Sequence, residues 1–239
     1  MMLDARLAAL VGTLPILLAG TGIPFDEPVG GAQLGARGEP VVDTGSGVPE
    51  LPDVEAASWL IADTDSGDVL AARNAHEPRP PASTIKLLTA LALLPDIDRG
   101  TTYVATEQVA RVEGSRVGLV PDERYSISDL EHGLLLASGN DAAYAVAELA
   151  GGADAALEKM NDAAARLGAF DTVATTPDGM DAARQLSSAY DLALIGRAVL
   201  ADDALAGVAR TRTYDFPGTD GETFQIQNQN RLLGSYDGA

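Results

Sequence analysis

Two pairs of strand-like runs lie near the ends of the region expected to fold. Residues 57–63 and 69–72 are rich in apolar side chains, and the Thr-Asp-Ser-Gly-Asp segment between them favours a turn. Residues 213–216 and 222–226 form a similar pair around the Pro- and Gly-containing segment 217–221. The pattern therefore predicts a β-hairpin near each end of this region.

Helical patterns dominate the middle of the chain. Residues 87–94 are apolar on nearly every face, which predicts a buried central helix that starts near Lys86. A capping-box pattern from Ser128 to Glu131 predicts a second helix, which the Ser138-Gly139-Asn140 segment ends. Residues 119–125 are predicted to form a turn, and further helices are predicted at 142–150, 153–167 and 187–200.

The N-terminal pattern differs from that of the rest. Residues 7–19 form an apolar stretch followed by small residues, and this favours a signal peptide over residues 1–20. The negative charge of Asp4 offsets the positive charge of Arg6, which weakens the positively charged start that is typical of a signal peptide. A misassigned start codon or an unstructured arm therefore stays open as an alternative. Residues 21–53 are rich in Gly and Pro and predict a linker without secondary structure. Residues 54–239 are predicted to form the folded domain.

Composition excludes several classes of function. The formal net charge of −19 over 239 residues would repel a phosphate backbone, so we expect no nucleic-acid partner. Absence of cysteine excludes disulfides and thiolate catalysis. The two histidines, His76 and His132, lack the spacing of a zinc motif. We therefore predict neither a metal site nor a cofactor.

One tetrapeptide combines a nucleophile with a base. Ser83 precedes Lys86 by three residues, and this spacing puts both side chains on one face of a helix. The hydroxyl becomes a good nucleophile when a neighbouring base takes its proton, and burial can lower the pKa of a lysine enough for that role. Alternatively, Ser83 is only a helix cap and Lys86 a surface residue whose charged end reaches water.

Two motifs in order resemble the serine-type D-alanyl-D-alanine carboxypeptidases, which are low-molecular-mass penicillin-binding proteins related to β-lactamases. The Ser83–Lys86 tetrapeptide, after Pro-Pro-Ala, is similar to the nucleophile motif of that family. Ser138-Gly139-Asn140 is similar to its Ser-x-Asn motif. The segments at 113–115, 187–193 and 228–233 fit in the expected order. The resemblance implies an α+β, β-lactamase/transpeptidase-like fold, with a helical subdomain packed on an antiparallel sheet.

The resemblance also implies a mechanism and a set of ligands. Ser83 would attack the peptide bond of a peptidoglycan stem peptide ending in D-Ala-D-Ala, and Lys86 would accept its proton. Ser138 would relay a proton to the leaving D-alanine, and Asn140 would bind the substrate. β-Lactams are the expected covalent inhibitors. The expected location is the cell envelope after export, and peripheral membrane association is left open.

One element of the family pattern is absent from the sequence. A Lys-Thr-Gly or Lys-Ser-Gly strand is expected after the segment at 228–233, but the chain ends at Ala239 without it. In the family this strand binds the substrate carboxylate and supplies an oxyanion N–H, so activity of this chain is in doubt. We therefore expect an incomplete domain that lacks the later sheet strands.

Three other functions remain as alternatives. A class A β-lactamase would use the same serine and lysine, but its second motif is Ser-Asp-Asn, and we find no Glu-x-x-Leu-Asn segment. A paralogue could bind peptidoglycan or penicillin without turnover. An acidic interaction domain unrelated to cell walls would require all the ordered matches to be accidental.

Overall fold

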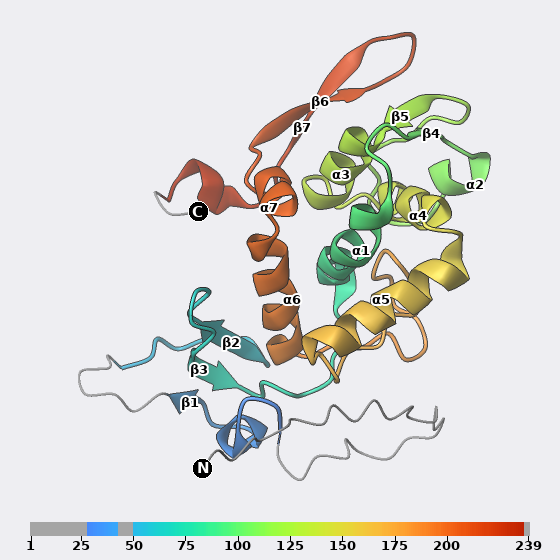
Figure 1. The fold of residues 1–239 in the computed structure, drawn as a ribbon. Helices are drawn as coiled ribbons and strands as arrows, with labels where there is room; N and C mark the ends of the chain where they lie inside the picture. The colour runs from blue at the N-terminus through green and yellow to red at the C-terminus, as the bar shows by residue number, and fades with distance from the viewer. Residues whose placement is uncertain (1–27, 43–49, 237–239) are drawn as a thin grey trace, which may run out of the picture.

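The computed structural model describes residues 28–42 and 50–236 of the chain. The predicted signal peptide at 1–20 lies outside these residues, and so does part of the predicted linker. The described part has a three-stranded sheet at one end, a group of helices in the middle and a long hairpin at the other end (Figure 1).

The three-stranded sheet contains the first predicted hairpin. Strands β2 (Trp59–Ala62) and β3 (Val69–Arg73) pair in antiparallel fashion, and β1 (Val41–Val42) pairs with the other edge of β3. Asp63 caps the hairpin turn, because its Oδ1 accepts hydrogen bonds from the backbone N–H groups of Asp65 and Ser66. The hairpin prediction is therefore confirmed.

Helix α1 (Lys86–Leu93) is the centre of the helical part and contacts four other helices. Its Leu88 and Leu93 side chains are fully buried, as the apolar pattern predicts. The four neighbours are α3 (Ile127–Leu135), α4 (Asn140–Leu149), α5 (Ala153–Leu167) and α6 (Ala189–Ala201). Shorter elements are α2 (Glu107–Ala110), α7 (Asp203–Ala209), η1 (Ala32–Gly35), η2 (Ala82–Ile85), η3 (Leu94–Asp96) and η4 (Arg231–Gly234).

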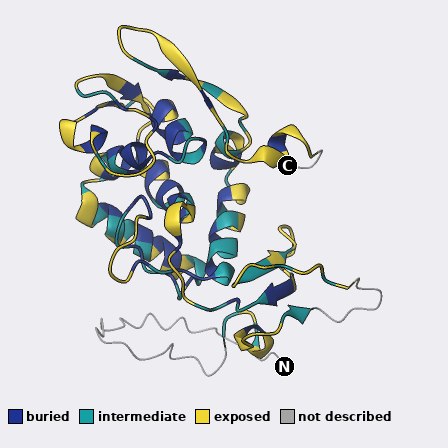
Figure 2. Cartoon of the chain, turned by 180° about the vertical axis from the view of Figure 1, so that it is seen from behind, coloured by how far each residue is buried: buried dark blue, intermediate teal, exposed yellow. Residues whose placement is uncertain are grey.

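Two further antiparallel strand pairs pack at the far end. The second predicted hairpin forms as β6 (Thr213–Pro217) and β7 (Thr223–Gln227), and a short pair is made by β4 (Thr102–Val104) and β5 (Arg124–Ser126). The rings of Tyr125 and Phe216 stack at 5.6 Å and join the two strand pairs. Much of the β6–β7 ribbon is exposed, whereas α1 and α4 are largely buried (Figure 2).

Three predictions about local structure are wrong. Residues 28–42 are not a featureless linker, because they contain η1 and β1. Residues 119–125 are not all turn, because 124–126 form β5. The capping box of α3 is made by Ser126 and Asp129 rather than by Ser128 and Glu131. Two overlapping Ser-x-x-acid patterns occur there, and the helix starts at the one that directly follows an extended strand.

The predicted break at residues 138–140 is confirmed. Ser138 adopts a left-handed φ of 58°, and the N–H of Gly139 closes the end of α3 on the carbonyl of Gly133 at 3.0 Å. Helix α4 then begins at Asn140, so the break delivers this side chain at the start of a new helix. In the part of the chain that the structure describes, no helix has the length and apolar character needed to cross a membrane.

Candidate active site

Ser83 lies in η2, the short helix that leads into α1. Ala82 has a left-handed φ of 48°, and its carbonyl lies against Gly179, where a Cβ atom would approach that oxygen to 2.0 Å. Only glycine fits at Gly179, since any side chain would collide with the Ala82 backbone. This contact joins the serine segment to the 175–180 loop.

The side chain of Lys86 lies beside the serine hydroxyl. Its Nζ is 2.9 Å from Oγ of Ser83, 2.8 Å from Oδ1 of Asn140 and 2.7 Å from the backbone carbonyl of Asp178. Lys86 is only 3% exposed, whereas Ser83 faces solvent. Ser83 makes no side-chain cap of its helix. The alternative of a simple cap and a surface lysine is therefore wrong.

Burial changes the acidity of this lysine. Removal of the ammonium from water lowers the pKa of Lys86 from 10.5 to about 8, although the negative charges of Asp178 and Asp141 act in the opposite direction. With this lower pKa, more of the molecules carry the neutral amine near neutral pH than an exposed lysine would allow. The site thus holds an amine that can accept a proton close to neutral pH.

Asn140 is brought to the site from α4. It is 2% exposed, and its Nδ2 donates a 2.6 Å hydrogen bond to the carbonyl of Glu113 while Oδ1 accepts from Lys86. Ser138 is half-buried, two residues earlier. Within the described residues, its hydroxyl takes no part in the hydrogen bonds that link Ser83, Lys86 and Asn140.

Sequence reasoning missed two groups of this network, the carbonyls of Glu113 and Asp178. Both are backbone atoms, so the residue type carries no signal of their role. A glycine marks each place: Gly114 follows Glu113 and Gly179 follows Asp178, and both have a positive φ, of 85° and 86°. These glycines are the features of the sequence that could have indicated close backbone approach.

A second polar cluster lies beside β3 and α6. His76 Nδ1 is 2.7 Å from a carboxylate oxygen of Asp171, and Nε2 is 3.0 Å from the carbonyl of Val29. Asp191 completes the group, and burial raises its pKa to about 6. Both ring nitrogens of His76 are engaged in hydrogen bonds, and possible ligand atoms of His76, Asp171 and Asp191 lie within 4.8 Å of one another.

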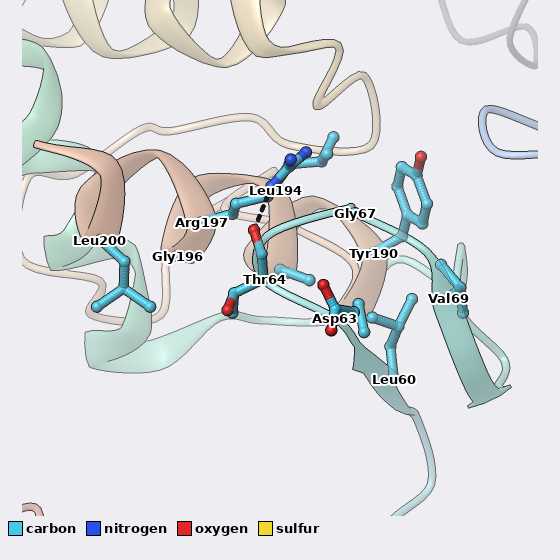
Figure 3. Close-up of a pocket in the computed structure, with 12 residues that line it drawn as sticks. Leu60, Asp63, Thr64, Gly67, Val69, Tyr190, Leu194, Gly196, Arg197 and Leu200 are labelled. Atoms are coloured by element: carbon cyan, nitrogen blue, oxygen red, sulfur yellow. Dashed lines mark hydrogen bonds between the residues drawn. The ribbon is translucent and has the colours of Figure 1, made fainter. Parts of the chain in front are cut away.

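A pocket is formed between the β2–β3 hairpin and α6 (Figure 3). Leu60 and Val69 of the hairpin face Tyr190 and Leu194 of the helix, and Arg197 closes the group by donating to the carbonyl of Thr64 at 2.8 Å. Ser83, Lys86, Ser138 and Asn140 are not among the residues that line it. The candidate site is therefore the open surface around Ser83 rather than this pocket.

A solvent-facing serine hydrogen-bonded to a buried lysine, with an asparagine from a neighbouring helix, is an arrangement suited to a serine hydrolase of the acyl-transfer class. Residues 46–238 match the family model described as D-alanyl-D-alanine carboxypeptidase, Peptidase_S11. The chain belongs to this family of serine carboxypeptidases, and the predicted resemblance is confirmed.

Individual relatives agree with the family. The chain is 44% identical over 196 residues to the D-alanyl-D-alanine carboxypeptidase DacB2 of Mycobacterium tuberculosis, covering 81% of this chain and 67% of the relative. It is 38% identical over 164 residues to DacD of Escherichia coli, covering 64% and 42%. A solved D-alanyl-D-alanine carboxypeptidase from M. tuberculosis superposes with a TM-score of 0.77 at 43% identity, covering 81% of this chain and 74% of that one. The penicillin-binding-protein fold is thereby confirmed.

Proposed function

We propose that this chain is a serine D,D-carboxypeptidase in which Ser83 is acylated by a peptidoglycan stem peptide ending in D-Ala-D-Ala. Ser83 Oγ forms a bond to the carbonyl carbon of the penultimate D-alanine while Lys86 takes the hydroxyl proton. The C–N bond then breaks, and the terminal D-alanine leaves with a proton on its amine. Water hydrolyses the ester and releases the shortened peptide.

The hydrogen bonds of Lys86 support the base role most directly. Asn140 Oδ1 and the Asp178 carbonyl can only accept, so they take two N–H groups of the neutral amine. The lone pair that remains is directed at the third neighbour, the Ser83 hydroxyl at 2.9 Å. The fixed acceptors thus orient the base before substrate arrives.

The second motif is assigned the roles that follow attack. Ser138 relays a proton to the leaving amine, which is consistent with its half-buried place two residues from Asn140. Asn140 binds the substrate carbonyl through the second hydrogen of Nδ2, because the first is held by Glu113. The same amide therefore has two tasks, to hold Lys86 and to receive substrate.

The location of the substrate bears on the role of the N-terminal residues. Peptidoglycan lies outside the cytoplasmic membrane, and the apolar stretch at 7–19 has the length of a signal-peptide core. We propose export with residues 1–20 as the signal. Mass spectrometry of the secreted or envelope-bound protein tests this, because export with cleavage removes the N-terminal peptide.

Two assays on the purified chain test the function. A fluorescent penicillin should label the wild type covalently and should not label Ser83→Ala, while release of D-alanine from a D-Ala-D-Ala peptide reports turnover. Labelling with release supports the carboxypeptidase. Labelling without release favours the non-catalytic penicillin-binding paralogue, and absence of both from a folded sample contradicts acylation at this site.

A further inference from the structure

The loop at residues 113–119 has no helix or strand of its own, yet hydrogen bonds to a side chain of α4 hold it in place. Asp141, the second residue of α4, accepts hydrogen bonds from three successive backbone N–H groups. These are Val117 at 2.9 Å, Gly118 at 2.8 Å and Leu119 at 3.0 Å. Asp141 is fully buried, so its carboxylate depends on these donors for compensation.

The other end of the same loop touches the candidate site. Carbonyls of Glu113 and Ser115 accept from the side chain and backbone of Asn140, at 2.6 and 2.7 Å. A Cβ atom on Gly114 would lie 2.6 Å from Nδ2 of Asn140. The loop therefore holds the Asn140 amide from one side while Lys86 holds it from the other.

We infer that Asp141 is a positioning residue for acylation, an inference that rests on the proposed function. By holding the amides of 117–119, it keeps the Glu113 carbonyl against Asn140. Asn140 then presents Oδ1 to Lys86, and the amine is directed at Ser83. Asp141 thus reaches the chemistry through the loop and touches no reacting atom itself.

A purely structural role for Asp141 is the competing explanation, and a matched control separates the two. Asp129 is also a buried carboxylate that accepts from a backbone N–H, that of Ser126 at 2.7 Å, but it caps α3 and also receives the Tyr214 hydroxyl at 2.7 Å. Asp141→Asn and Asp129→Asn should both lower the melting temperature. Only Asp141→Asn should lower the acylation rate of the folded fraction, by roughly ten- to a hundredfold.

The pH profile of acylation adds a readout that loss of stability alone does not move. The charge of Asp141 favours the ammonium of Lys86. Removal of this charge in Asp141→Asn should move the pH at which the acylation rate begins to fall to a lower value. The maximum rate, reached at higher pH, should also decrease. A folded Asp141→Asn protein with the wild-type plateau and limb would overturn the inference.

A second variant covers the case in which Asp141→Asn does not fold. Gly114→Ala acts from the exposed side of the loop and pushes it away from the Asn140 amide. Its control is Gly152→Ala, at a glycine with a similar positive φ of 96° and no neighbour within 4 Å of the added atom. Gly114→Ala should acylate more slowly than Gly152→Ala. Equal rates would contradict the link between the loop and the site.

NMR keeps this inference separable from the proposed function. The sequence has only two lysines, Lys86 and Lys159, so lysine-selective labelling gives two side-chain signals. If penicillin does not label the wild type, the proposed function is contradicted. The NMR signal of the Lys86 side chain would then still test whether Asp141 positions the site. A shift of that signal in Asp141→Asn and also in Gly114→Ala, which alters no charge, but in neither Asp129→Asn nor Gly152→Ala supports the inference, and an unchanged signal overturns it.

Discussion

Oδ1 of Asn140 lies 2.8 Å from Nζ of Lys86, although the two residues are 54 positions apart in the chain. The helix break at Ser138 brings Asn140 to the start of α4, and the contact between α1 and α4 brings it to the lysine. Two motifs that are separate in sequence thus share one hydrogen-bond network.

Replacement of Asn140 should impair acylation more than stability explains. Asn140→Ala removes one of the two acceptors that orient the Lys86 amine, and we expect the rate of penicillin acylation to fall by about 10²-fold. Stopped-flow or gel-based labelling of the folded protein measures this rate.

Asn161→Ala is the matched control for that variant. The Asn161 amide also bridges backbone groups, with bonds to Leu157 and Ala174, and none of these bonds involves Ser83, Lys86 or Asn140. This variant should melt earlier and still acylate at the wild-type rate. Similar losses of rate in both variants would mean that Asn140 acts only through the fold.

Acylation should depend on the protonation of Lys86. Because its pKa is about 8, the neutral amine becomes scarce as pH falls below that value, and the rate should fall about tenfold per pH unit well below it. A pH–rate profile of penicillin acylation measures the limb. Lys86→Arg, which cannot lose its proton, should reduce the rate by about 10²–10⁴ at every pH tested. A flat profile in the wild type would contradict the base role.

The His76 cluster should make stability depend on pH. Burial opposes protonation of His76, but the hydrogen bonds that the ring donates to the Asp171 carboxylate and the Val29 carbonyl outweigh it, so the pKa of His76 is raised. Its stabilising contribution is therefore fully present below pH 6.5 and is lost as pH rises through the raised value. Asp191, also in the cluster, has a pKa that burial raises to about 6, so its own titration is centred near that pH.

Melting temperatures at pH 6.5 and pH 8.5 test that dependence. The advantage of the wild type over His76→Gln should be larger at pH 6.5 than at pH 8.5. Asp171→Asn removes the carboxylate partner and should reduce the same difference. An advantage of equal size at both pH values would show that the imidazole contributes by packing on Tyr190 rather than by charge.

The sequence pointed to the side chains proposed for the site but not to the backbone groups that hold them. Ser83 and Lys86 were proposed because their spacing on a helix is local, and Ser138 and Asn140 because Ser138-Gly139-Asn140 resembles the second motif of the family. Glu113 and Asp178 were missed because they act through backbone carbonyls. The role of Asp141 was also missed, although an acid within an apolar helix is a signal that could have indicated a buried partner.

The errors in the fold have local causes. Ser126 and Ser128 both begin a capping pattern, and the choice between them depends on where β5 ends. Strand β1 is two residues long and forms only because β3 offers a free edge, so no pattern within its own sequence predicts it. Pairing between distant segments, rather than propensity, decided both outcomes.

The site of covalent attachment tests the central claim most directly. After reaction with penicillin, trypsin should release a peptide that ends at Lys86 and contains Ser83 as its single serine, beside Thr84. Fragmentation should place the adduct on Ser83, with full labelling of Thr84→Ala and none of Ser83→Ala. An adduct on another residue, or a folded Ser83→Ala protein that is still labelled, would contradict the account.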